Sequence, residues 1–141
     1  MGDPERAQRI TRLAVNIAMV LQVGEPQLSD VEQAAQLFVS PPFAHAFDGG
    51  GSDLPLVTAA GALALAAHEH YDGTGRPHGL RGDAIPLAAR IIRAAAAFDD
   101  LLHGETADSS SGRAIALLSD VRGHEFDPLV IGALRLLHSV K

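Results

Sequence analysis

The chain has 141 residues and a formal net charge of −6; 47% of its residues are hydrophobic and only 4% are aromatic. This length predicts a single domain over residues 1–141 with a packed core, and the acidic balance argues against nucleic-acid binding. The absence of cysteine excludes disulfides and thiolate metal sites, and no apolar run suits a signal peptide or a membrane span, so we expect a cytoplasmic domain without membrane contact.

Apolar residues recur at helical spacing in six segments, and no segment has convincing strand alternation. Pro4 at a first helical position starts the first segment, and Ser29 with Glu32 at capping-box spacing starts the second. Prolines stop the second segment, and three consecutive glycines predict a mobile loop over 43–53. We expect an all-α bundle with helices at 3–21, 29–39, 56–70, 86–103, 113–122 and 128–140.

The sequence HEHYDGTGRPHGLRGDAIP, residues 68–86 and here named the turn segment, is the least ordinary stretch of the chain. Its histidines beside carboxylates raise the hypothesis of a metal site, and its glycines indicate tight turns. On a helix, His68 and His70 would lie about 200° apart and could not hold one ion together. We expect His78 to be a solvated loop residue.

The turn segment and the residues after it resemble the signature region of the HD-GYP family, a branch of the HD-domain metal-dependent phosphohydrolases that hydrolyses cyclic di-GMP. Members typically read H-H-E, a basic and an aromatic residue, D-G-x-G-Y-P, x-G-L, x-G and I-P-L-x-A-R-I. The matching residues are Glu69, His70, Tyr71, Asp72, Gly73, Gly75, Pro77, Gly79, Leu80, Gly82, Ile85, Pro86, Leu87, Ala89, Arg90 and Ile91. AFDDLL and GHEFDPLVIGAL resemble later family segments. The resemblance implies an HD-domain-like helical bundle, here with a shortened middle region.

The family's metal-ligand positions are where this chain departs from the pattern. Its members use two or three metal ions, held by histidines and carboxylates, to activate a water and offset phosphate charge. In these positions the chain has Arg6, Phe38, Val39, Ala67 and Ala96. Only His68 matches an expected ligand, and we interpret it as vestigial. We expect the apolar replacements to converge in a cluster beneath residues 71–85, with no metal and no cofactor.

Arginines of the turn segment are the candidates for binding a partner or a ligand. Arg76 stands where the family has the tyrosine of G-Y-P, and guanidinium binds carboxylate or phosphate in bidentate fashion. The candidate binding residues are Arg76, His78, Arg81 and Arg90. For Arg90 we also expect an ion pair with a carboxylate, such as Asp72 or Asp99.

These features predict a degenerate HD-GYP domain that is not an enzyme and acts in bacterial signalling by protein docking or dimerisation. The expected partner is a signalling protein domain, such as the GGDEF domains associated with the family's G-Y-P face, or a second copy of the chain. A non-hydrolysing sensor of cyclic di-GMP or another nucleotide is the alternative. A weak metal-dependent phosphodiesterase is a third hypothesis.

Overall fold

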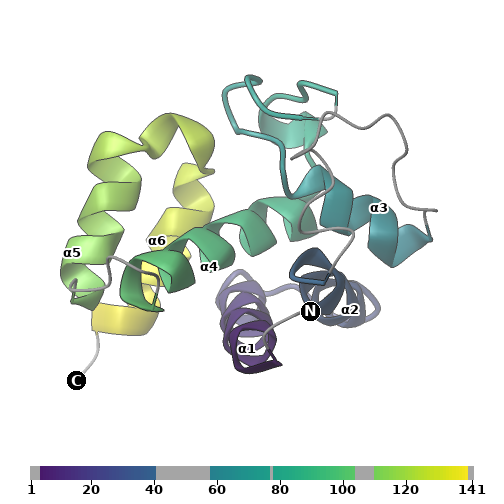
Figure 1. Ribbon diagram of the computed structural model, residues 1–141, viewed down its shortest axis with the longest axis horizontal. Coiled ribbons are helices and arrows are strands. Elements are labelled where there is room, and N and C mark those ends of the chain that lie inside the picture. The colour runs from purple at the N-terminus through teal and green to yellow at the C-terminus, as the bar shows by residue number, and fades with distance from the viewer. Residues whose placement is uncertain (1–3, 41–57, 77, 104–109, 140–141) are drawn as a thin grey trace.

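The computed structural model describes residues 4–40, 58–76, 78–103 and 110–139 (Figure 1). These residues form six α-helices and contain no strand, only one isolated bridge between Asp72 and Arg81. The helices are α1 (Pro4–Val20), α2 (Gln27–Phe38), α3 (Ala59–Ala66), α4 (Leu87–His103), α5 (Ser111–Ala116) and α6 (Pro128–Ser139). The prediction of an all-α fold with six helices is confirmed. The expected loop over 43–53, and with it most of the shortened middle region, lies outside the described residues.

Helix α4 runs through the centre of the molecule, with α1 and α2 along one side and α5 and α6 at its C-terminal end (Figure 1). Its sequence suits this place, because the isoleucines at 91 and 92 and the alanines from 94 to 97 are all buried. The small alanine side chains let neighbouring helices approach α4 closely, and buried Ile10 and Ile17 of α1 fill the space between them.

Two helix ends differ from the sequence prediction. Helix α2 begins two residues before Ser29, and the Glu25 carboxylate accepts hydrogen bonds from the amide (3.1 Å) and hydroxyl (2.8 Å) of Ser29. The expected capping box of Ser29 with Glu32 is therefore wrong. Helix α3 ends at Ala66 instead of continuing to residue 70, because the chain there turns into the turn segment.

The predicted helix over 113–122 is regular only in its first part. After α5 the chain forms a π-helical turn at Leu117–Val121 and a short 3₁₀ turn at Gly123–Glu125. Such π turns are rare and occur often at functional sites. Among the described helices, none combines the length and the apolar character that crossing a membrane requires.

Candidate functional site

Glu69 holds the turn segment from inside. It is almost completely buried, with 1% of the residue exposed. Its carboxylate accepts hydrogen bonds from the backbone amides of His78 (2.8 Å) and Leu80 (3.0 Å). At the other side of the segment, the amide of Tyr71 donates to the carbonyl of Glu125 (3.1 Å). The turn segment is therefore fixed to the body of the domain by a buried carboxyl group and by backbone hydrogen bonds.

Gly75 lets two parts of the turn segment pass in close contact. A Cβ atom at this position would lie 2.7 Å from the carbonyl oxygen of His68 and closer still to the amide nitrogen of His70, so no other residue fits without moving the backbone. Asp72 supports the same turn, because its Oδ1 accepts from the amide (3.1 Å) and hydroxyl (2.7 Å) of Thr74. Turn geometry thus explains the glycine and aspartate of the signature.

Three of the candidate binding residues lie on the surface of the turn segment. Arg76, His78 and Arg81 are exposed. Arg81 is also part of the turn, because its Nε donates to the carbonyl of Asp72 (3.1 Å). Their role in binding a partner or a ligand stays a prediction.

Arg90 pairs with a carboxylate as expected, but the partner is Asp127 instead of Asp72 or Asp99, and a role of Arg90 in binding stays a prediction. Its Nη1 lies 2.7 Å from Oδ2 of Asp127, and its Nε donates to the carbonyl of Ile85 (2.8 Å). Asp99 instead pairs with Arg9 at 2.7 Å. Arg90 therefore joins the start of α4 to the start of α6. Sequence spacing along α4 could not reveal Asp127, which the fold brings from 37 residues away.

Neither histidine near the end of α3 sits on the helix. His68 stacks on Phe38 with ring centroids 5.0 Å apart. Burial and the neighbouring Arg93 lower the pKa of His70, which favours the neutral ring. In that state His70 Nε2 accepts from Nη2 of Arg93 (2.9 Å), and Nδ1 donates to the hydroxyl of Thr74 (3.1 Å). His70 thereby links Arg93 of α4 to the turn segment.

The apolar residues in the family's ligand positions join one core, as expected. Val39, Ala67 and Ala96 are buried, and Phe38 packs against the same cluster. Nothing at these positions can coordinate a metal ion. Within the described ranges, no group of three or more histidine, cysteine, aspartate or glutamate side chains is close enough together to hold one. The residues present do not fit the metal centre that the resemblance implies, and the expectation of no cofactor stays a prediction.

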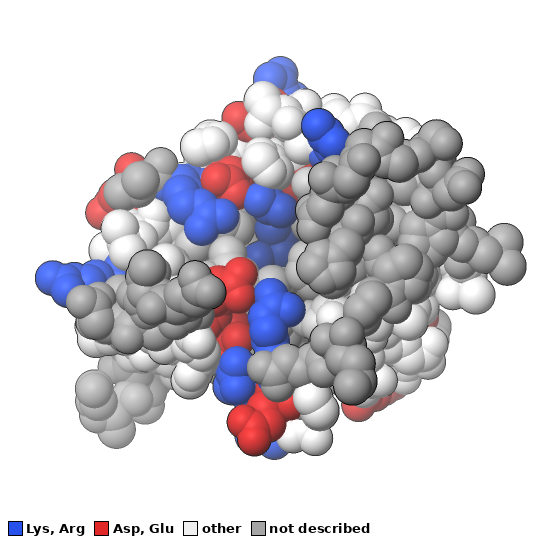
Figure 2. Space-filling model, viewed as in Figure 1, with Lys and Arg blue, Asp and Glu red and all other residues white. Residues whose placement is uncertain are grey.

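Beside this core lies a hollow of about 200 Å³, here named the arginine hollow. Its lining residues are Arg6, Phe38, Arg93, Ala96, Ala97, Asp100 and Arg122. Three of them, Arg6, Phe38 and Ala96, stand in positions where the resemblance expects metal ligands. Figure 2 shows positive and negative side chains gathered along the middle of this face of the molecule. The hollow therefore includes three positions where the resemblance implies metal ligands, and its lining contains three arginines.

Carboxylates orient the three arginines. Arg6 pairs with Asp100 (3.1 Å), and Glu125 lies between Arg93 (2.6 Å) and Arg122 (3.0 Å). Burial alone would raise the pKa of Glu125, but its hydrogen bonds from Arg122 and Arg93 outweigh that effect and lower the pKa to about 2. Glu125 is therefore ionised at neutral pH and holds two guanidinium groups in fixed orientations.

Arg93 keeps an unused donor. Its side chain is 18% exposed, and its Nε is buried without a hydrogen-bond partner in the part of the chain that the structure describes. Both Arg93 and Arg122 also lie over the ring of Phe126, at 5.7 and 5.4 Å from its centroid. A buried N–H without an acceptor costs about 1–3 kcal/mol.

Sequence reasoning missed Arg93 and Arg122 as members of the site. A signal was present, because Arg93 lies three residues before Ala96 and so shares its face of α4. Every cation of the chain before Lys141 is also an arginine, the residue best suited to planar anions. The position of Arg122 depends on the irregular turns before α6, which no periodicity indicates.

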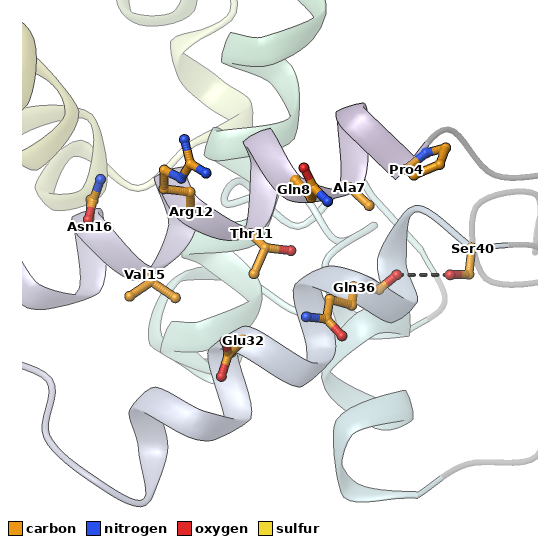
Figure 3. A pocket seen from close by; sticks show the side chains of 10 residues that line it. All are labelled: Pro4, Ala7, Gln8, Thr11, Arg12, Val15, Asn16, Glu32, Gln36 and Ser40. Carbon is orange, nitrogen blue, oxygen red and sulfur yellow. Dashed lines mark hydrogen bonds between the residues drawn. The ribbon is translucent and has the colours of Figure 1, made fainter.

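A larger groove lies between α1 and α2, with a volume of about 550 Å³. Figure 3 shows that its walls are one face of each helix, and that the side chain of Thr11 lies between them. Arg12 and Glu32 are the charged residues among those that line it, and amide side chains such as Gln8 and Gln36 contribute most of the rest of its polar character. The α1–α2 groove is thus wider than the arginine hollow, with fewer charges.

The sequence profile of the HD domain family matches residues 52–130. The chain belongs to the HD domain family. Over 86 residues, 60% of this chain and 23% of the relative, this HD domain is 42% identical to the cyclic di-GMP phosphodiesterase response regulator RpfG of Xanthomonas campestris. Over 87 residues it is 39% identical to a probable cyclic di-GMP phosphodiesterase of Vibrio cholerae, covering 59% of this chain and 19% of that protein. The chain thus spans about a fifth of the length of these relatives.

Solved structures agree with the fold. A cyclic GMP-AMP specific phosphodiesterase of V. cholerae superposes with a TM-score of 0.76 at 20% identity, covering 98% of this chain and 44% of that one. The HDG"Y"P protein Bd1817 of Bdellovibrio bacteriovorus gives 0.75 at 16% identity, covering 96% and 52%. At such identities the superpositions establish the HD-domain fold alone. The resemblance to the HD-GYP family is confirmed, and the degenerate character of this member stays a prediction.

The expectation that the domain is not an enzyme is contradicted. The relatives at 42% and 39% identity are named cyclic di-GMP phosphodiesterases, which puts this HD domain in a family of enzymes. The expectation rested on the residue types at the expected metal-ligand positions of one sequence. Residue types at one site do not measure catalytic activity.

Proposed function

We propose that this HD domain binds cyclic di-GMP in a bacterial signalling protein and holds a phosphate of the ligand in the arginine hollow. The observation that carries the proposal is the lining of the hollow. Three arginines, Arg6, Arg93 and Arg122, line one small hollow. The relatives' names supply the ligand class, since these proteins are phosphodiesterases for cyclic di-GMP.

Guanidinium groups are well suited to binding a phosphate. A phosphodiester is anionic and has two free oxygens, and arginine offers parallel N–H donors that match them. Glu125 has fixed Arg93 and Arg122 before any ligand arrives, so less side-chain entropy is lost on binding. The chain is acidic overall, with a net charge of −6, which makes a local cluster of arginines the natural place for an anion.

The proposal is tested by calorimetric titration of the chain with cyclic di-GMP. Arg122→Gln removes one guanidinium from the hollow while Arg93 stays with Glu125, and we expect about tenfold weaker binding because a hydrogen bond to a charged group contributes roughly 1.5–3 kcal/mol. Arg93→Lys keeps the charge but loses the bidentate geometry and should also weaken binding.

Arg12→Gln is the matched control, because Arg12 lines the α1–α2 groove instead. Circular dichroism and thermal unfolding check that each variant is folded. The proposal fails if the unmodified chain does not bind cyclic di-GMP, or if the Arg12 variant weakens binding as much as the Arg122 variant.

Protein docking through the turn segment is a second candidate function. It is favoured by the exposure of Arg76 and His78 on a turn that Glu69 fixes from within, because a rigid exposed turn loses little entropy when a partner binds. The partner would be an acidic surface of a signalling domain, such as a GGDEF domain, or of a second copy of the chain. Replacing Arg76 and Arg81 with alanine should reduce capture of such a domain at low salt. Unchanged capture would remove the turn segment from the mechanism.

A further inference from the structure

We infer that the domain binds a small organic cation, a primary amine on an apolar chain, in a pocket that is separate from the arginine hollow. The pocket has a volume of about 450 Å³ and lies between the turn after α1, helices α2 and α3, and the start of α4. None of its lining residues also lines the arginine hollow. It is here named the apolar pocket, after the large apolar residues in its lining: Leu21, Val23, Val31, Leu63, Leu87 and Ile91.

The size and the walls of the apolar pocket suit a whole small molecule. Sites that enclose such ligands have volumes of roughly 300–1,000 Å³ and mostly apolar walls, with a few polar groups that fix the orientation of the ligand. Leu21, Leu63 and Leu87 pack against the core and are only partly buried. An apolar chain in the pocket would remove more of their surface from water, which is the main favourable contribution to binding.

Asp30 determines the charge of the ligand. It is the one ionisable residue among the described residues that line the pocket, so this lining has a formal charge of −1. Its side chain is half-buried and has no hydrogen bond or ion pair with another residue that the structure describes. Asp30 also lies in the first turn of α2, where a negative charge stabilises a helix, but that role does not require a place in a pocket wall. A carboxylate beside apolar walls favours a cation that carries its own apolar chain.

Two glutamines complete the polar part of the lining. Gln27 lies three residues before Asp30 on α2 and so shares its face of the helix. Gln22 has a φ of 65°, in the left-handed region that favours glycine, and it ends α1 with the amide of Val23 donating to the carbonyl of Ala18 (2.9 Å). This cap does not require an amide side chain. An ammonium group has three donors, and the carboxylate and the two amide oxygens can each accept one.

The test uses three probes that share a six-carbon chain: hexylammonium, 1-hexanol and hexanoate. Each probe is titrated into the ¹⁵N-labelled chain, and its affinity is taken from the shifts of backbone amides around the pocket, such as those of Leu63 and Ile91. We expect hexylammonium to bind about fivefold more tightly than 1-hexanol, because a hydrogen bond to a charged group adds to the contribution of the chain. Hexanoate should bind most weakly, since its charge repels Asp30.

Variants locate the site within the protein. Asp30→Asn should remove the difference between hexylammonium and 1-hexanol. Glu32→Gln is the matched control, because it makes the same change in net charge on the same helix but lines the α1–α2 groove. Ala88→Leu places a larger side chain in the wall of the apolar pocket and should weaken the binding of both probes about fivefold. Circular dichroism checks that each variant is folded.

Three results would overturn the inference. Equal affinity for hexylammonium and 1-hexanol removes the role of Asp30. A loss of hexylammonium affinity in Glu32→Gln as large as in Asp30→Asn means that net charge accounts for binding. Displacement of hexylammonium by cyclic di-GMP places both ligands at one site, and it leaves the proposed function standing. If Ala88→Leu does not fold, the comparison of Asp30→Asn with Glu32→Gln decides.

Discussion

The α1–α2 groove has a volume of about 550 Å³ and the arginine hollow about 200 Å³, yet the smaller of the two has the residues that suit a nucleotide. Among its lining residues the groove has one arginine, Arg12, and one glutamate, Glu32. The hollow has three arginines, two of them fixed by Glu125. The volume of a pocket limits how much ligand surface it can bury. Whether an anionic phosphate binds more favourably there than in water depends on the fixed positive charges around it. Substitutions in the two regions test this difference, from the largest expected effect to the smallest.

Removing two guanidiniums from the hollow should have the largest effect. We expect Arg6→Gln combined with Arg122→Gln to weaken cyclic di-GMP binding about 100-fold, because each charged hydrogen bond contributes roughly 1.5–3 kcal/mol. Arg93 remains with Glu125 in this variant, so the fold should be kept. Gln8→Ala combined with Gln36→Ala makes the matched change in the groove and should alter the affinity less than about twofold. If only the groove variant binds cyclic di-GMP more weakly, the ligand binds in the α1–α2 groove and not in the arginine hollow.

Glu125 should stabilise the fold in a pH-dependent way. Its pKa is lowered from 4.5 to about 2, so its contribution is fully present above pH 4.5 and is lost as the pH falls toward 2. After allowance for solvent screening, we expect Glu125→Gln to cost on the order of 2 kcal/mol at pH 7 in urea unfolding, and less at pH 3. Glu32→Gln, on the exposed wall of the groove, should stay within about 0.5 kcal/mol at both pH values. A Glu125→Gln difference independent of pH would contradict the role given to its ion pairs.

Substitution of Thr11 should raise the stability of the fold, whereas substitution of Glu125 should lower it. Its Oγ1 is buried without a hydrogen-bond partner among the described residues, and the residue is 8% exposed. Thr11→Val replaces that hydroxyl with a methyl group of similar size, so we expect a gain of about 1 kcal/mol in the free energy of unfolding. Cyclic di-GMP affinity should not change. A loss of stability would mean that the hydroxyl is satisfied in solution by water in the groove.

Arg76 should give the smallest effect on stability. Its side chain is exposed on the turn segment, so Arg76→Ala should change the free energy of unfolding by less than about 0.5 kcal/mol. Nucleotide affinity should also be unchanged, because Arg76 does not line the hollow. If Arg76→Ala weakens nucleotide binding as much as Arg122→Gln, general surface charge accounts for binding and the hollow does not.

The sequence was enough to predict the helices and the family, because both depend on local signals. Apolar periodicity indicates the six helices, and the fixed spacing around Gly75 and Arg90 carries the HD-GYP resemblance. The same alignment reveals the apolar replacements, such as Val39 and Ala67. The ion pairs, such as Arg93 with Glu125, join residues that are far apart in the chain. No sequence spacing indicates such pairs. The arginine hollow was missed for that reason, although one of its arginines stands at a replaced ligand position.

The central claim is that the arginine hollow holds a phosphate, and the side chain of Arg122 reports on it most directly. This side chain lines the hollow and is 38% exposed, so its Nε–H resonance should shift when a phosphate comes next to the guanidinium. The measurement is a titration of ¹⁵N-labelled chain with cyclic di-GMP, in which the Arg122 Nε–H signal is assigned from its loss in Arg122→Lys. The account predicts a shift that saturates with the calorimetric affinity, while the Arg12 signal stays in place. Saturated binding without any change at Arg122 would contradict it.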